Sequence, residues 1–359
     1  MTGRHDGAAS HAHPFETLAR PAELAAMDRA LELAARGPVD DPNPRVGCVL
    51  LGPHGDVLGE GWHRGAGTPH AEAAAVAEAR AAGRDLAAAV AVVTLEPCNH
   101  TGRTGPCADL LLAAGVARVV YAVADPDPVA SGGAQRLRSA GVEVVPGVRA
   151  ERGEELLEVW LHAVRTGRPF VTLKVATSLD GRVAAADGSS RWITSPEARV
   201  HAHALRSAVG AIAVGTGTAL ADDPALTARG ADGSLAGHQP LRVVVGNRAI
   251  PAGARLHGRG GELVHVRTHD PTEVLQTLAG RGVRHLLVEG GPTLATAFLR
   301  AGLVDRLHAY VAPVLLGAGR SVVDDLGVTG IAGALRLVTT AVEQLGSDVL
   351  VIASTEGTM

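Results

Sequence analysis

Four residues between positions 70 and 107 have the types needed for chemistry at a metal ion. His70 precedes Glu72 by two residues, and Cys98 and Cys107 follow further along the chain. One imidazole and two thiolates suit tetrahedral zinc and leave its fourth position for water. Pairs of ligands on one helix face are four residues apart, so the spacing favours Glu72 as a group that moves protons rather than as a ligand. The pattern predicts a catalytic zinc site held by His70, Cys98 and Cys107.

Two other interpretations of these residues are open. A structural zinc site is one, although such sites usually show four protein ligands and only three are found here. A set of unrelated core residues is the other. Cys107 follows Pro106 at the expected start of a helix, where the helix dipole favours a thiolate. The third cysteine, Cys48, falls in the middle of an expected strand and is interpreted as a core residue.

The elements that must position these residues follow from apolar periodicity and from turn and cap residues. Strands alternate with helices in both halves, which predicts α/β layers around largely parallel sheets. In the N-terminal half we expect helices over 21–36, 69–83, 106–114 and 135–140, and strands over 46–51, 57–62, 89–95, 116–123 and 142–145. In the C-terminal half we expect helices over 195–208, 270–280 and 293–301, and strands over 171–176, 211–215, 241–245, 285–289, 307–315 and 349–353. Thr68 is the expected N-cap of the second helix, with Pro69 at its first position.

The chain of 359 residues is about the length of two domains. We expect a disordered arm over 1–19, a first domain over 20–150, a helical linker over 151–168 and a second domain over 169–359. The linker assignment follows from a charged helical pattern that ends in a Gly- and Pro-containing segment.

The first domain resembles a known enzyme half. Its H-x-E…P-C pattern is that of zinc nucleobase deaminases, except that eight residues rather than two separate the cysteines. The longer segments DPNPRVG (41–47), GEGWH (59–63) and TLEPCNHTGRTGPC (94–107) resemble the deaminase half of the bifunctional riboflavin-biosynthesis deaminase/reductases. This resemblance implies a cytidine-deaminase-like three-layer α/β/α fold and a phosphoribosylaminopyrimidine substrate. It also implies that Asn43 and His63 face the substrate and that Arg103 meets its phosphate, for which a guanidinium beside a Gly-rich loop is suited.

The second domain carries a strand, a glycine pair and a helix start over 288–294 (VEGGPTL), where exposed backbone N–H groups can bind phosphate. With the segments LKVATSLDG (173–181), SRWITS (190–195) and GTALADDPALTAR (217–229), it resembles the reductase half of the same family. That half is similar to dihydrofolate reductase in fold and uses NADPH. The resemblance implies NADPH contacts from Ala176, Trp192, Thr194, Thr218, Asp222, Gly291, Pro292, Thr293, Leu294, Ala295 and Thr296. It implies substrate contacts from Ser190, Arg206, Leu226, Arg229 and Glu289.

One residue stands out by its rarity. Of the 33 basic residues, Lys174 is the only lysine and the rest are arginine. A site that keeps lysine needs a compact charge on a flexible stem, which arginine does not supply. We therefore expect Lys174 to meet the substrate of the reductase site and to act in catalysis; chance survival on a surface strand is the alternative.

Composition limits the other possibilities. The net charge is −4 and aromatic residues make up 2% of the chain, which opposes nucleic-acid binding. No apolar run reaches the length of a membrane span. Three cysteines in a chain of this length do not suggest a disulfide framework, so we expect a cytoplasmic enzyme. We also expect a homo-oligomer.

These observations combine into one predicted function. The chain is expected to be a bifunctional enzyme with Zn²⁺ and NADPH as cofactors, which deaminates a diaminopyrimidine and then reduces its ribosyl side chain to ribityl. The alternatives are a nucleoside or tRNA base deaminase with an unrelated C-terminal domain, and a non-catalytic zinc-stabilised binding module. Glu72 separates the last from an enzyme, because a structural zinc site does not require a carboxylate there.

Overall fold

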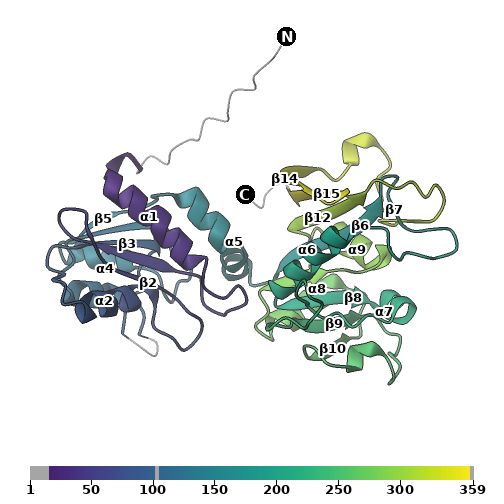
Figure 1. Ribbon diagram of the computed structural model, residues 1–359, viewed down its shortest axis with the longest axis horizontal. Coiled ribbons are helices and arrows are strands. Elements are labelled where there is room, and N and C mark those ends of the chain that lie inside the picture. Colours follow the sequence, from purple (N-terminus) through teal and green to yellow (C-terminus); the bar gives the residue numbers. More distant parts are fainter. Residues whose placement is uncertain (1–15, 102–104, 356–359) are drawn as a thin grey trace, which may run out of the picture. The chain divides into compact units, whose positions relative to one another are not determined.

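The computed structural model describes residues 16–101 and 105–355, and the chain divides into two compact units between Arg165 and Thr166. Figure 1 shows both units, and each is described by itself below. None of the helices in the described part of the chain has the length and apolarity needed to cross a membrane. Short 3₁₀ helices are Glu16–Leu18 (η1), Arg255–His257 (η2) and Ile331–Gly333 (η3).

The first unit is built on a five-stranded sheet with the order β2-β1-β3-β4-β5. Its strands are β1 (Gly47–Leu51), β2 (Val57–Trp62), β3 (Val90–Leu95), β4 (Arg118–Val123) and β5 (Glu143–Val145). Strand β1 is antiparallel to both of its neighbours, and β3, β4 and β5 are parallel. The expectation of a largely parallel sheet is therefore wrong for this unit. The physical reason is the five-residue connection from β1 to β2, which allows a hairpin but is too short for a parallel crossover.

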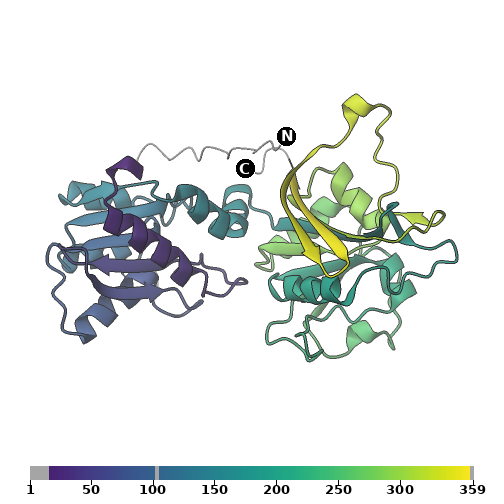
Figure 2. The ribbon, with the colours of Figure 1, turned by 45° about the horizontal axis from the view of Figure 1, so that its top comes forward.

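Helices cover both faces of this sheet, as Figures 1 and 2 show. They are α1 (Pro21–Ala34), α2 (Ala71–Ala81), α3 (Cys107–Ala113), α4 (Gly133–Ser139) and α5 (Ala150–Thr166). Side chains alternate along β1, so that Val49 joins the core under α1 and α5 whereas Cys48 joins the core under α2, α3 and α4. The result is the expected three-layer α/β/α arrangement. Helix α5, which the sequence places in a linker, buries Leu157 and Leu161 in the core of this unit.

Helix α2 begins later than expected. Its first helical residue is Ala71 and its N-cap position is His70, not Thr68. The Thr68 hydroxyl donates to the carbonyl oxygen of Gly65 at 2.7 Å, which stabilises the turn before the helix instead. The prediction of Thr68 as N-cap is wrong because this local turn uses its side chain. As a consequence, His70 lies at the N-terminal end of the helix and Glu72 in its first turn.

The second unit is built on an eight-stranded sheet with the order β10-β9-β8-β11-β6-β12-β15-β14. The strands are β6 (Phe170–Ser178), β8 (Ala211–Gly215), β9 (Leu241–Val245), β10 (Leu263–Val266), β11 (His285–Val288), β12 (Arg306–Ala312), β14 (Leu337–Leu345) and β15 (Asp348–Thr355). All pairings from β10 to β12 are parallel, and those of β15 with β12 and β14 are antiparallel. A separate two-stranded sheet pairs β7 (Arg182–Ala184) with β13 (Arg320–Ser321).

Four helices accompany this sheet: α6 (Pro196–Ser207), α7 (Thr216–Asp222), α8 (Pro271–Ala279) and α9 (Pro292–Arg300). Helices α8 and α9 pack on one face through Val274 and Phe298, and α6 covers the other face near Tyr310. Because the central strands are parallel, their carboxyl ends meet at one edge of the sheet. The turn after β8 and the turn after β11 both open helices at that edge, which places α7 and α9 side by side.

Several elements were not expected from the sequence: β7, β10, β13, β14 and α7. Strand β14 is partly exposed along most of its length, so its apolar residues show no clear alternation. Strand β10 has only four residues, and α7 only seven. Such short or exposed segments bury too few side chains to leave a periodic signal.

Candidate functional site

The three expected zinc ligands converge in the first unit. His70 lies at the N-cap of α2, Cys98 follows β3, and Cys107 is the first residue of α3. Their ligand atoms all lie within 4.8 Å of one another. The two cysteines are nine residues apart and yet adjacent, because the start of α3 lies against Cys98: the N–H of Ala108 donates to the carbonyl oxygen of Cys98 at 3.2 Å.

The spacing of these atoms fits zinc. The Nδ1 atom of His70 lies 3.6 Å from the sulfur of Cys98 and 3.4 Å from that of Cys107. Zinc bonds of about 2.3 Å to sulfur and 2.0–2.1 Å to nitrogen, at a tetrahedral angle, separate the two donor atoms by about 3.6 Å. The residues present therefore fit a tetrahedral ion with three protein ligands and one position left over.

Local electrostatics favour a thiolate at this place. Cys107 starts α3, so the positive end of that helix faces the cluster. Its backbone N–H donates to the sulfur of Cys98 at 3.5 Å. Hydrogen bonding from Cys107, against the opposing effect of burial and with further help from His70, lowers the pKa of the Cys98 thiol. Cys48 is fully buried in the neighbouring core, as expected, and burial raises the pKa of its thiol.

Glu72 is buried beside the metal ligands, with only 4% of its surface exposed. Burial, with the nearby Cys98 thiolate, raises the pKa of this carboxyl group to about 7. A carboxyl group in the first turn of α2 and next to Cys107 is placed to exchange protons with a water molecule at the open zinc position. The structure thus brings the predicted proton-transfer group to the predicted ligands.

Two expected substrate residues adjoin the cluster. The rings of His63 and His70 are in edge contact, with centroids 5.7 Å apart. His63 is buried, its Nδ1 lies 3.2 Å from the carbonyl oxygen of Pro69, and its Nε2 lies 3.2 Å from the side-chain nitrogen of Asn43. A carbonyl only accepts, so these partners are satisfied when Nδ1 donates to Pro69 and Nε2 accepts from Asn43. Arg103 lies outside the residues that the structure describes.

Sequence reasoning missed two residues that shape the loop holding Cys98. The buried carboxylate of Glu96 accepts from the backbone N–H groups of Ala134, at 2.9 Å, and Asp125, at 3.3 Å. Gly133 approaches so closely that a Cβ there would lie 1.7 Å from the carbonyl oxygen of Pro97. The signals were present, since Glu96 stands two residues before Cys98 and Gly133 belongs to a glycine pair. Neither residue could be assigned to the site from the sequence, because their contacts depend on which loops are neighbours in the fold.

The second unit gathers three charged residues from distant parts of the chain. Lys174 lies in β6, Arg206 in α6 and Glu289 directly after β11. Two nitrogens of the Arg206 guanidinium donate to the two oxygens of Glu289, both at 2.7 Å. The Lys174 ammonium lies 3.9 Å from the same carboxylate. All three side chains are at least four-fifths buried, so their charges are screened little by water.

The pKa values in this cluster follow from burial and charge. Burial by itself would raise the pKa of Glu289, but Arg206 and Lys174 outweigh it and hold that pKa at about 2. Burial lowers the pKa of Lys174, with Glu289 opposing the change and Arg206 adding to it. Glu289 is therefore a fixed anion that compensates two buried cations.

The other expected substrate residues of this unit are placed less uniformly. Arg229 donates to the Thr227 hydroxyl at 3.1 Å and to the Gly233 carbonyl at 2.9 Å. Leu226 is buried, and its backbone φ is +50°, a value that residues other than glycine rarely adopt. Ser190 is half-buried in the loop that follows β7. Arg206, expected to contact the substrate, already donates two hydrogen bonds to Glu289.

The expected cofactor residues cluster where α7 and α9 start. The Gly291 N–H donates to the Thr218 hydroxyl at 3.0 Å, which ties the two turns together. A Cβ at Gly291 would lie 3.0 Å from that hydroxyl, so glycine allows the two turns to approach this closely. Because Gly291 already donates to Thr218 and Pro292 has no N–H, the positive end of α9 and the N–H of Thr293 are what this helix start offers to a phosphate of a dinucleotide. Pro292, Leu294, Ala295 and Thr296 are buried in α9, and Thr293 is exposed.

The remaining cofactor candidates come from α7, from the loop before α6 and from β6. Trp192 is 70% exposed, and the Arg199 guanidinium lies 4.7 Å from its ring centroid. The Asp222 carbonyl accepts from Arg191 at 2.6 Å, and the Thr194 carbonyl accepts from Arg199 at 2.7 Å. Ala176 is half-buried in β6, two residues beyond Lys174.

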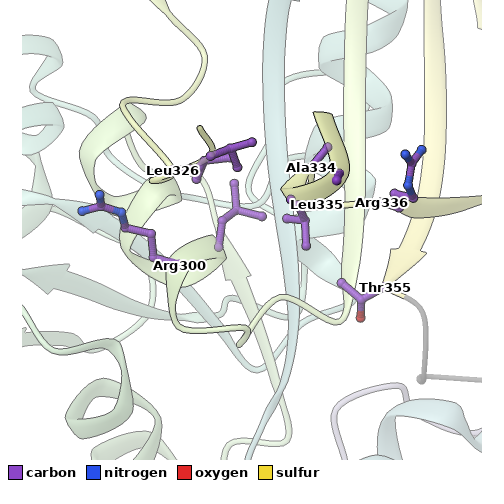
Figure 3. Close-up of a pocket in the computed structure, with 10 residues that line it drawn as sticks. Arg300, Leu326, Ala334, Leu335, Arg336 and Thr355 are labelled. Carbon is purple, nitrogen blue, oxygen red and sulfur yellow. The ribbon is translucent and has the colours of Figure 1, made fainter. Parts of the chain in front are cut away.

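A cavity of about 510 Å³ in the second unit lies elsewhere, as Figure 3 shows. It is lined by Leu299 and Arg300 at the C-terminal end of α9, by residues of the segment 326–336 and by Thr355. Helix α9 has nine residues, about 13 Å, so this cavity is at the end of the helix opposite Gly291. It does not belong to the cluster of Lys174, Arg206 and Glu289.

Comparison with known proteins agrees with this division into two sites. Residues 21–123 match the cytidine and deoxycytidylate deaminase zinc-binding region, and residues 169–351 match the RibD C-terminal domain. The riboflavin biosynthesis protein RibD of Mycobacterium tuberculosis is 54% identical over 310 residues, covering 86% of this chain and 90% of that protein. That of Escherichia coli is 41% identical over 359 residues, covering 90% and 96%.

Solved structures give the same answer for the whole chain. A diaminohydroxyphosphoribosylaminopyrimidine deaminase/5-amino-6-(5-phosphoribosylamino)uracil reductase from Thermotoga maritima is 33% identical with a TM-score of 0.85, covering 93% of this chain and 99% of that one. Acinetobacter baumannii RibD is 38% identical with a TM-score of 0.82 and the same coverage. The fold, the zinc site and the two enzymatic halves expected from the sequence are thereby confirmed. The chain belongs to the RibD family of bifunctional riboflavin-biosynthesis enzymes, in which a zinc-dependent deaminase is joined to a reductase.

Proposed function

We propose that this chain deaminates 2,5-diamino-6-(5-phosphoribosylamino)pyrimidin-4-one at its first site and then reduces the ribosyl side chain of the product to ribityl at its second. The observation that carries the proposal is the meeting of His70, Cys98 and Cys107 with the buried Glu72 beside them. A structural zinc site has no use for that carboxyl group, whereas a hydrolytic deamination requires a group that moves protons. The two activities of the similar Thermotoga maritima enzyme supply the substrates.

At the first site, zinc, when bound, supplies a Lewis acid that lowers the pKa of a water molecule. We assign the proton steps to Glu72, which takes a proton from the attacking water and passes it to the exocyclic nitrogen that leaves as ammonia. Asn43 and His63 hold the pyrimidine against the cluster, since their shared hydrogen bond fixes both side chains. Arg103 is assigned to the substrate phosphate on its position in the sequence.

At the second site, NADPH, when bound, supplies the hydride. We assign Lys174 to the substrate, which it positions for hydride transfer to C1′, and Glu289 to holding Lys174 and Arg206 in place. Ser190, Leu226 and Arg229 complete the substrate side of the site. The cofactor side of the site is assigned to Ala176, Trp192, Thr194, Thr218, Asp222 and the segment 291–296.

One pair of variants tests both assignments. Glu72→Gln is expected to abolish ammonia release and to keep NADPH consumption when the deaminated substrate is supplied, because each site has its own residues. Lys174→Arg is expected to keep ammonia release and to slow reduction at least tenfold, about 1.4 kcal/mol of transition-state stabilisation. Glu78→Gln is the matched control for Glu72→Gln, since Glu78 lies in the same helix and is exposed. Ammonia release by Glu72→Gln, or wild-type reduction by Lys174→Arg, would contradict the corresponding role.

We further propose that the enzyme works in the cytoplasm as a homo-oligomer. All three cysteines are free, and the metal site needs two of them reduced. The edge strand β14 exposes Val342, and the nearby Ile331 and Leu335 are also exposed, which suits contact with another copy. Sedimentation of the purified chain tests the oligomer; a monomer at micromolar concentration contradicts it.

A further inference from the structure

Lys174 is held only loosely by its carboxylate partner. Both oxygens of Glu289 receive short hydrogen bonds from Arg206, whereas the Lys174 nitrogen stays 3.9 Å away. Burial and the like charge of Arg206 both disfavour the ammonium. A buried cation of this kind needs a further source of stabilisation if it is to stay charged and in place.

The ring of Tyr310 supplies a second contact. The Lys174 nitrogen lies 5.4 Å from the centroid of this ring, within the range of a cation–π interaction. Tyr310 lies in β12, which pairs with β6 so that His308 is opposite Lys174 and Tyr310 is opposite Ala176. These side chains share one face of the sheet. A contact with a ring face attracts the ammonium without occupying its N–H donors, so these stay available for a substrate.

Tyr310 is itself fixed in place. Only 1% of its surface is exposed, and it packs against Ala198 and Ala202 of α6 and Leu350 of β15. Its hydroxyl lies 2.7 Å from Nδ1 of His201, also in α6. Burial raises the pKa of the Tyr310 hydroxyl, so the phenol stays neutral.

We propose that Tyr310 is a positioning residue of the reductase site: its ring face holds the Lys174 ammonium opposite Glu289, and its bond to His201 sets the angle of the ring. The proposal rests on the role of Lys174 in the proposed function. The rate of reduction then depends on Tyr310 and His201, which are not among the substrate or cofactor residues named above. The charged and titratable groups close to Lys174 are Glu289 after β11, Arg206 from α6, and His308 and Tyr310 from β12. Two histidines of α6 lie further out: His201 contacts Tyr310, and His203 interacts with Arg206 and Glu289.

The single lysine of the chain allows a direct measurement. Incorporation of ¹³C-lysine gives one set of side-chain NMR signals, and their pH titration reports the pKa of Lys174 alone. Tyr310→Leu removes the ring face, and we expect the pKa of Lys174 to fall by about half a unit to one unit. Tyr310→Phe keeps the ring face and loses only the bond to His201, and we expect a change of at most a few tenths of a unit.

Kinetics give the second measurement. We expect kcat for reduction to fall about tenfold in Tyr310→Leu and about threefold in Tyr310→Phe, with KM for NADPH and ammonia release unchanged. A purely structural role of Tyr310 would not move the lysine pKa. Equal behaviour of the two variants in both measurements, or wild-type values in a folded Tyr310→Leu protein, would overturn the proposal.

A graded series keeps the test decisive if Tyr310→Leu does not fold. Phenylalanine at position 310 and its di- and trifluorinated analogues have nearly one shape but progressively weaker ring faces. We expect the pKa of Lys174 and kcat for reduction to fall together along this series, and a flat series refutes the contact. Failure of the proposed function is a different result: wild-type reduction in Lys174→Arg removes the role of Lys174, while the lysine pKa still tests the ring.

Discussion

The ion pair between Glu289 and Arg206 offers the most quantitative test of the second site. We consider Glu289→Gln, which keeps the shape of the side chain and removes its charge. In the folded protein the pKa of Glu289 is about 2, compared with 4.5 for the ordinary side chain. At about 1.4 kcal/mol for each pH unit, the ionised carboxylate stabilises the second unit by about 3 kcal/mol at pH 7. The carboxylate is only 8% exposed, so little of this is lost to solvent screening.

The sign of the pH dependence follows from the lowered pKa. A carboxyl group with a pKa depressed by folding contributes its full stability above its unfolded value of 4.5 and loses it as the pH falls through about 2. The difference between wild type and Glu289→Gln should therefore be constant from pH 7 to about 5. It should fall to about 1.4 kcal/mol at pH 3, because the carboxyl group of the unfolded chain has gained its proton there while that of the folded chain is still mostly ionised.

The assay is urea unfolding of the intact chain, followed by the NMR signals of ¹³C-labelled Lys174. This residue lies in β6, so its signals report the folded and unfolded populations of the second unit alone. The control is Glu262→Gln, which breaks the ion pair of Glu262 with Arg281 in the same unit. That pair spans 3.0 Å, but its side chains are 64% and 43% exposed, so its loss should cost no more than about 0.5 kcal/mol.

Two outcomes would refute this reasoning. A loss below about 1 kcal/mol at pH 7 would mean that Arg206 and Lys174 do not depend on Glu289 for their compensation. A loss that stays the same from pH 7 to pH 3 would mean that shape or hydrogen bonding, and not charge, determines the cost of the substitution.

Two further predictions concern the first site. Cys98→Ser should reduce the bound zinc to well below one ion per chain, measured by metal analysis of the folded protein, because a hydroxyl is a poor replacement for a thiolate ligand; a full complement of zinc would refute the ligand set. Gly133→Ala should lower zinc content and ammonia release although it touches no ligand, since its Cβ would lie 1.7 Å from the carbonyl oxygen of Pro97 and displace the loop that carries Cys98. Reduction of the deaminated substrate by Gly133→Ala should stay at the wild-type rate, and normal zinc content in this variant would show that the loop adapts.

The sequence predicted long, buried elements well. The strands over 211–215 and 241–245 have the predicted bounds, because four of the five residues in each are apolar and glycine or proline marks both ends. Strand β14 gave no such signal, since neighbouring side chains along it are exposed on both faces. The start of α2 was predicted wrongly because the Thr68 hydroxyl donates to Gly65 within the preceding turn rather than capping the helix.

By itself, the sequence determined the ligand set of the metal site, the separation of Glu72 from the ligands and the order of the two enzymatic halves. These rest on residue types and spacing, which zinc chemistry restricts tightly. Only the tertiary structure decided the partners of the second site. This site combines residues from four parts of the chain, spread over more than 130 positions: Lys174, Arg206, Glu289 and Tyr310. Which of these buried charges pair depends on which strands are neighbours in the sheet. Burial then fixes which charge is compensated and how strongly, and no local pattern in a sequence carries that information.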